Sequence, residues 1–127
     1  MKEEVQMTIN EAGECLTDAK IMFEGKRWKA AVSRSYYSMY HAAKAVLLSE
    51  NIEAFTHQGV NIQFGKHFIK TGIFDRRLIK TFSKMLDARQ KADYEIGFEA
   101  SESDAHHAYS EVEIFFNEMS GYIFKKE

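Results

Sequence analysis

Residues 27–49 read RWKAAVSRSYYSMYHAAKAVLLS, and this stretch decides the fold. Its apolar and small side chains recur at steps of three and four residues, the spacing that places side chains on one face of an α-helix. The stripe consists of Trp28, Ala31, Val32, Ser35, Tyr36, Met39, Ala42, Ala43, Val46 and Leu47. The period predicts a long helix over residues 27–49.

The same period continues on both sides of this stretch. The further helices are predicted over residues 4–24, 58–70, 75–92 and from near residue 101 to residue 122. Gly25 ends the first helix as its C-terminal cap, and Gly72 ends the one over residues 58–70. Ser101 and Asp104 have the spacing of a short capping box at the start of the last helix.

The composition agrees with a purely helical chain. It has 127 residues, no proline and seven glycines, so few of its residues favour the turns that a strand-rich fold needs. A chain of this length suits one compact domain with a core of its own. We therefore predict an all-α, up-and-down bundle of four to five helices that forms a single domain over residues 1–127.

Charge and cysteine content exclude several classes of protein. The net charge of -2 argues against broad, charge-driven coating of nucleic acid, although a local basic site stays open. Cys15 is the single cysteine, and the first residues lack the basic and apolar run of a secretory signal. Charged or amide residues interrupt every apolar run before it reaches the length of a membrane span. We expect a cytoplasmic protein that does not bind membranes.

The helix over residues 27–49 has a second face to explain. Arg34, Tyr37, His41 and Leu48 lie nearly opposite the apolar stripe when residues are placed 100° apart. A helix with apolar side chains on both faces is buried twice, once by its own bundle and once by another chain or a ligand. We expect a homodimer with this helix near its axis. The alternative is that Tyr37 and Leu48 are scattered surface residues.

Arg34 and His41 are separated by two helical turns, about 10 Å along the axis, and project from one face. Cleavage of RNA without a metal needs a group of near-neutral pKa to move a proton and a fixed cation to hold the phosphate. Histidine and arginine suit these two roles. Such a pair also arises by chance, and the alternative is that both side chains only make hydrogen bonds between helices.

The residues around this pair make the pattern specific. The segment AAVSRSYYSMYHAAKAVLL, residues 30–48, resembles the signature helix of the HEPN (higher eukaryotes and prokaryotes nucleotide-binding) domain. The likeness is closest to small, stand-alone prokaryotic members. It continues through residues 57–60 (HQGV), Phe64, Gly72 and the pattern Arg89-x-x-x-Asp93-Tyr94, so it covers nearly the whole chain in order.

The resemblance implies an up-and-down helical bundle that dimerises. Many members of the family are metal-independent endoribonucleases, often toxins paired with a small nucleotidyltransferase antitoxin. Their shared motif is an arginine, a polar residue, and a histidine after a short spacer, which here corresponds to Arg34, Ser35 and His41. By this likeness Arg34 would hold the scissile phosphate of an RNA substrate and His41 would act as general acid or base. Two such pairs would meet across the dimer.

The chain departs from the family pattern at two places. The residue after the arginine is commonly Asn, Asp or His in active nucleases, and here it is Ser35. In one toxin branch a modifiable tyrosine follows the histidine closely, whereas here two alanines follow His41. Tyr37 and Tyr40 lie before the histidine, where they could support the site. An alternative function therefore stays open: a non-catalytic module that binds a nucleotide or docks on a nucleotidyltransferase.

Other polar residues admit two interpretations. Arg89 and Asp93 have the spacing of a surface ion pair, with Tyr94 packing or hydrogen bonding beside them. The alternative is that these three residues shape a groove beside Arg34. His57 is expected to make a cap or loop contact, although it could touch a phosphate.

We also considered cofactors. The paired Glu-x-x-His elements of di-metal bundles are missing, and the helical pairs Glu102 with His106 and Asp104 with His107 lack evident partners. We expect neither a metal site nor a cofactor.

Overall fold

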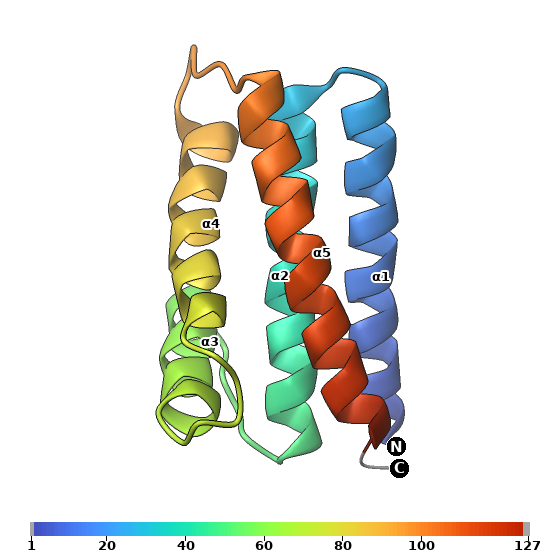
Figure 1. Ribbon diagram of the computed structural model, residues 1–127, viewed down its shortest axis with the longest axis vertical. Coiled ribbons are helices and arrows are strands. Elements are labelled where there is room, and N and C mark those ends of the chain that lie inside the picture. Colours follow the sequence, from blue (N-terminus) through green and yellow to red (C-terminus); the bar gives the residue numbers. More distant parts are fainter. Residues whose placement is uncertain (1, 126–127) are drawn as a thin grey trace.

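The computed structural model describes residues 2–125, and these form an all-α bundle. Its helices are α1 (Glu3–Glu24), α2 (Trp28–Ser49), α3 (His57–Phe64), α4 (Arg77–Tyr94) and α5 (Glu102–Lys125). One π-helical turn, Gly65–Ile69, extends α3. The four long helices run up and down in chain order, and α3 lies below α4 at the end where α1 begins (Figure 1). The predicted fold class is confirmed, with five helices and no strand among these residues.

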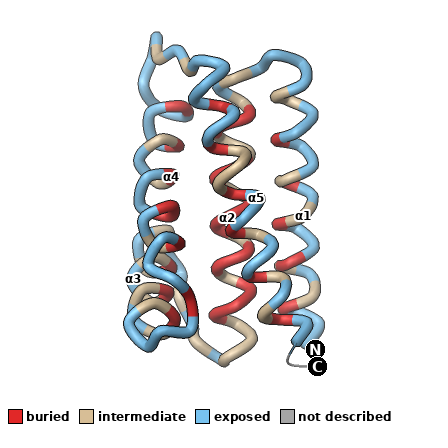
Figure 2. The backbone as a smooth tube through the Cα atoms, viewed as in Figure 1, coloured by how far each residue is buried: buried red, intermediate tan, exposed pale blue. Residues whose placement is uncertain are grey.

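Helix α2 is the centre of the bundle. It packs against α1, α3, α4 and α5, and buried positions follow its whole length (Figure 2). Small residues at its buried positions, among them Ala31, Ala42 and Ala45, let neighbouring helices approach closely. The buried Ser38 hydroxyl donates a 2.8 Å hydrogen bond to the Ala12 carbonyl oxygen, so it fixes the register of α2 against α1. The predicted apolar stripe is the face that these neighbours cover.

Most helix ends agree with the prediction. Gly25 caps α1, although the residue with positive φ is Lys26, at 60°. At the start of α5 the Ser101 hydroxyl accepts from the Asp104 N–H, and the Asp104 carboxylate accepts from the Ser101 N–H, each over 3.0 Å. This pair is the capping box that the sequence predicts.

The predicted helix over residues 58–70 is present, but its second half, Gly65–Ile69, is a π-helix. The Lys70 N–H bonds to the Gly65 carbonyl oxygen, an i→i+5 bond that widens the turn. Phe64 and Phe68 both lie in the core, where the Phe64 ring lies 5.4 Å from that of Phe115. The segment ends near Gly72, which has φ +81°.

None of the helices in residues 2–125 combines the length and the apolar character that a membrane span requires.

The aromatic packing predicts a large loss of stability on truncation of Phe64. Its ring is completely buried and packs against Phe68, Phe74, Phe82 and Phe115. Phe64→Ala should lower the free energy of unfolding by about 3–5 kcal/mol. The matched control is Phe55→Ala, because Phe55 is 84% exposed. Its effect should stay within about 0.5 kcal/mol. Urea denaturation of both variants measures the difference, and equal losses would contradict this account of the core.

Candidate functional site

One face of α2 carries the pair that the sequence singles out. Arg34 and His41 are both half-buried, as is Tyr37 between them. The Arg34 guanidinium carbon lies 4.9 Å from the centre of the Tyr37 ring, a cation–π contact that restrains the guanidinium. The Tyr37 ring thus lies directly beside the Arg34 guanidinium.

His41 is held in its neutral form. Burial lowers the pKa of its imidazole below the ordinary value, and the positive charges of Lys44 and Arg34 act in the same direction, whereas Glu11 opposes them. A neutral imidazole has a free ring nitrogen that can accept a proton. The site therefore pairs a proton acceptor with a restrained cation on one helix.

A second cluster lies beside this pair, where α3 and α4 meet α2. The Tyr36 hydroxyl is hydrogen bonded to Nδ1 of His57, and the His57 ring centre lies 4.3 Å from that of Tyr40. The Arg89 guanidinium carbon lies 5.0 Å from the centre of the Tyr36 ring. One of its terminal nitrogens donates a 3.3 Å hydrogen bond to the Tyr94 hydroxyl. Residues from three helices thus converge here.

The protonation states in this cluster follow from burial. Burial raises the pKa of Tyr36 well above its ordinary value, although Arg89 opposes the shift. Burial and the charge of Arg89 both lower the pKa of His57. Tyr36 therefore keeps its proton, and the hydrogen bond joins a protonated tyrosine to a neutral His57.

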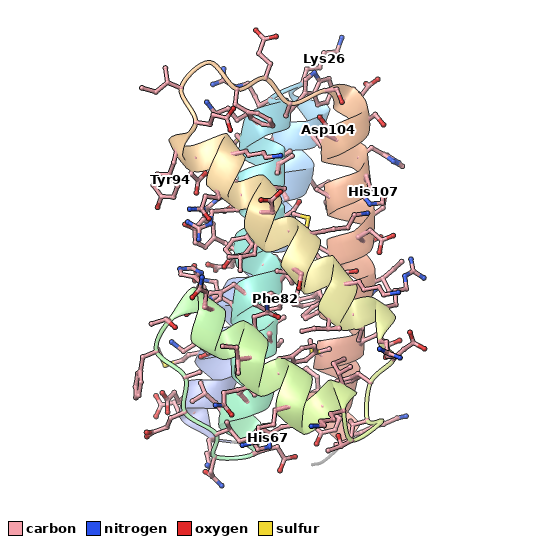
Figure 3. All side chains as sticks on the ribbon, turned by 90° about the vertical axis from the view of Figure 1, so that its left-hand side faces the viewer. Lys26, His67, Phe82, Tyr94, Asp104 and His107 are labelled. Atoms are coloured by element: carbon pink, nitrogen blue, oxygen red, sulfur yellow. The ribbon has the colours of Figure 1, made fainter. Side chains whose placement is uncertain are left out.

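Aromatic rings join the two clusters. The Tyr40 ring centre lies 5.3 Å from that of His41, and the Tyr36 ring centre lies 5.2 Å from that of Tyr37. We call the combined set the polar strip. It consists of Arg34, Tyr36, Tyr37, Tyr40, His41, His57, Arg89 and Tyr94. Tyr94 is 68% exposed and points outward from the last turn of α4 (Figure 3).

Three interpretations from the sequence need correction. The expected surface ion pair of Arg89 with Asp93 is wrong: among the described residues no ion pair joins them, Arg89 is buried, and Asp93 instead accepts a 2.8 Å hydrogen bond from Ser33. Because Arg89 points toward α2, it cannot also reach a carboxylate on the exposed side of α4. The expected cap or loop role of His57 is also wrong, since Thr56 caps α3 and the His57 ring packs against α2.

Ser35, expected to support the site, lies in the core instead. It is fully buried, and its hydroxyl donates a 2.8 Å hydrogen bond to the Ala31 carbonyl oxygen on its own helix. One residue along a helix turns the side chain by 100°, which carries Ser35 away from the face of Arg34.

Sequence reasoning assigned Tyr36 to the apolar stripe only, and so missed its role in the polar strip. A signal was present, because a buried tyrosine hydroxyl usually has a hydrogen-bond partner. It also missed a group that could hold a metal ion: the ligand atoms of Glu11, Cys15 and His41 lie within 4.8 Å of one another.

Comparison with known proteins places this arrangement in a family. The model of the HEPN domain matches residues 5–122, nearly the whole chain. The chain belongs to the HEPN domain family. The helical bundle described above is thus the structure of a HEPN domain.

Similar HEPN proteins occur in archaea. A protein of Methanocaldococcus jannaschii named "Putative toxin" is 36% identical over 94% of this chain and 88% of its own length. A second protein of that organism with the same description is 33% identical over 98% of this chain and 85% of its own length. A "UPF0332 protein" of Archaeoglobus fulgidus is 33% identical over 89% of this chain and 90% of its own length.

The lowered pKa of His57 predicts that acid destabilises the fold. As the pH falls below the ordinary value of 6.5, the unfolded chain binds a proton at this histidine before the folded chain does. The free energy of unfolding should therefore decrease from about pH 6.5 downward, until the folded form also becomes protonated.

The variant His57→Gln should show a weaker dependence on pH over this interval. His107→Gln is the control, because His107 is exposed on α5, away from the polar strip (Figure 3). Urea denaturation at several pH values measures both. If the free energy of unfolding of the wild type increases as the pH is lowered from 6.5 to 5, the assignment of a neutral His57 is contradicted.

Proposed function

We propose that this protein is a metal-independent endoribonuclease whose catalytic residues are Arg34 and His41. The observation that carries the proposal is their arrangement on one face of α2, where His41 has a lowered pKa and Arg34 is restrained by Tyr37. The resemblance to nucleases of the HEPN family supports the assignment of RNA as substrate.

The chemistry follows from these two side chains. The neutral His41 takes the proton of a ribose 2′-hydroxyl, and the 2′-oxygen then attacks the adjacent phosphorus. A bond from the 2′-oxygen to phosphorus forms, and the bond from phosphorus to the 5′-oxygen breaks. Arg34 stabilises the negative charge that develops on the phosphate oxygens, for which its planar fork is suited. The products are a 2′,3′-cyclic phosphate and a 5′-hydroxyl.

The leaving 5′-oxygen needs a proton from a general acid. We propose that a second copy of the chain supplies it from its own His41 in the protonated form, which the negative charge of the bound phosphate would favour, in a homodimer that packs through α2. The half-buried Tyr37 and Leu48 on this face support such an interface, because a partner would complete their burial.

The rest of the polar strip would form a groove for flanking nucleotides. Tyr94 is an exposed ring beside the cationic Arg89, an arrangement on which an unstacked RNA base can stack. His57 adds its second ring nitrogen, Nε2, as a hydrogen-bonding atom for a phosphate or a base edge.

The toxin names of the two Methanocaldococcus relatives support a place in a toxin–antitoxin pair. Following the family likeness, the proposed partner is a small nucleotidyltransferase that acts as antitoxin.

A second candidate function is a non-catalytic module that binds a nucleotide or docks on a nucleotidyltransferase. The observation that favours it is the burial of Ser35, since its hydroxyl bonds back to Ala31 and leaves only Arg34 and His41 of the motif facing outward. In this alternative both side chains contact phosphate without turnover.

Cleavage of a labelled transfer RNA pool in the presence of a chelator separates the two candidates. Wild type should release fragments ending in a cyclic phosphate. His41→Ala should lose at least about 100-fold in rate because the proton acceptor is gone. Arg34→Ala should lose about 100- to 1,000-fold because the transition state is no longer stabilised.

His107→Ala is the control, and it should cleave like wild type because His107 lies on the exposed side of α5. Undiminished cleavage by His41→Ala would refute the assignment. If the folded wild type cleaves nothing but binds a nucleotide or a nucleotidyltransferase, the second candidate stands.

The proposed dimer predicts a specific response to charge on α2. Leu48→Glu should convert the dimer to a monomer, because it places a carboxylate in the apolar interface and another at the equivalent position of the second copy. Sedimentation velocity measures the assembly, and circular dichroism checks that the variant stays folded. Ile114→Glu on α5 is the control, since Ile114 is also partly exposed, and it should remain dimeric. A monomeric wild type would refute the dimer.

A further inference from the structure

Three side chains with metal-binding atoms meet on the α1 side of the polar strip. Glu11 and Cys15 lie one turn apart on α1, and His41 of α2 faces them. The three ligand atoms lie within 4.8 Å of one another, and the Cys15 sulfur is 3.9 Å from a Glu11 carboxylate oxygen. Cys15 is buried, His41 is half-buried and Glu11 is exposed. The group therefore lies at the surface of the bundle, and only its cysteine is fully buried.

The spacing of these atoms is close to that of a tetrahedral site. Metal–ligand bonds of about 2.0–2.3 Å at tetrahedral angles put ligand atoms roughly 3.3–3.6 Å apart. The group needs to contract by about 1 Å, which small side-chain rotations can supply. The cysteine and histidine ligands are held by the packing of α1 on α2, where the hydrogen bond from Ser38 to Ala12 lies one turn away from both.

The donor set selects the class of ion. A sulfur, an imidazole nitrogen and one carboxylate oxygen suit a borderline transition metal such as Zn²⁺, whereas Mg²⁺ and Ca²⁺ prefer oxygen ligands. Three protein ligands leave a fourth position for water.

We propose that Glu11, Cys15 and His41 bind a divalent transition-metal ion of the Zn²⁺ class, and that the bound ion inhibits the enzyme by occupying His41. On binding, the Cys15 thiol releases its proton to solvent and its sulfur bonds to the metal, with no change of oxidation state. The inhibition rests on the proposed ribonuclease function, whereas the binding does not. The site differs from the sequence-based expectation of no metal site.

Cobalt(II) is the probe for the binding. The full chain should bind one Co²⁺ per protomer and show a thiolate-to-cobalt charge-transfer band together with the strong visible bands of a tetrahedral ion. Cys15→Ser keeps the size of the side chain and Cys15→Ala removes the sulfur altogether; both should abolish the charge-transfer band. Glu11→Gln and His41→Gln should weaken binding at least about tenfold. Competition with Zn²⁺ should bleach the spectrum.

Glu14→Gln is the matched control. It removes the same charge from an exposed glutamate on α1 that is not among the three ligands, so its spectrum and affinity should equal those of wild type. No charge-transfer band in wild type, or an unchanged band in Cys15→Ser and Cys15→Ala, would overturn the proposed site.

The same proteins test the inhibition. Zn²⁺ should suppress RNA cleavage by wild type, and a chelator should restore it, whereas Cys15→Ser should cleave at the wild-type rate and resist Zn²⁺ at least about tenfold better. If wild type shows the cobalt spectrum but never cleaves RNA, the proposed function fails and the metal site stands. If wild type cleaves RNA and gives no cobalt spectrum, the metal site alone fails. Equal sensitivity of wild type and Cys15→Ser to Zn²⁺ would overturn the inhibitory role.

Discussion

The burial of α2 by the other helices is the constraint on which the rest of the structure depends. A central helix must satisfy or expose every polar side chain that it carries, because a buried polar group without a partner is costly. Ser35 and Ser38 are satisfied by backbone carbonyl oxygens, on the same helix and on α1 respectively. Arg34 and His41 instead stay half-buried at the edge of the packing. The site is thus the part of α2 that the bundle leaves uncovered.

The aromatic rings of α2 extend this edge into a connected surface. Tyr36 and Tyr40 have their rings against His57, and Tyr36 also lies beneath the guanidinium of Arg89. Burial disfavours a charge on either group, so a neutral imidazole and a protonated tyrosine coexist there; the charge of Arg89 further lowers the pKa of His57 but opposes the raised pKa of Tyr36. One Arg89 nitrogen, Nε, is buried without a hydrogen-bond partner among the described residues. At this end of the polar strip, beside the exposed Tyr94, the Nε–H of Arg89 is thus a buried donor without a hydrogen bond within the described residues.

Local sequence patterns predicted the helices and the faces of α2, because both depend only on the geometry of a single helix. The period of 3.6 residues gave the long helices, and the same angles placed Arg34, Tyr37 and His41 together on one side of α2. The patterns did not predict what depends on contacts between helices. No local pattern marks the π-turn over Gly65–Ile69, and Arg89 is buried because α2 offers it a tyrosine ring. On α1 alone, Glu11 and Cys15 give no sign of a metal site, because the third ligand atom comes from His41 on α2.

Catalysis without a metal and inhibition by a metal draw on the same property of His41. Burial disfavours the imidazolium, and this leaves a lone pair on the ring at neutral pH. That lone pair can take a proton from a ribose hydroxyl or bond to a transition-metal ion, but not both at once. A metal at this position would therefore compete with the proposed reaction. Because Arg34 does not contribute a ligand, its contact with Tyr37 can persist when the ion binds, so inhibition would act on proton transfer while leaving the phosphate site in place.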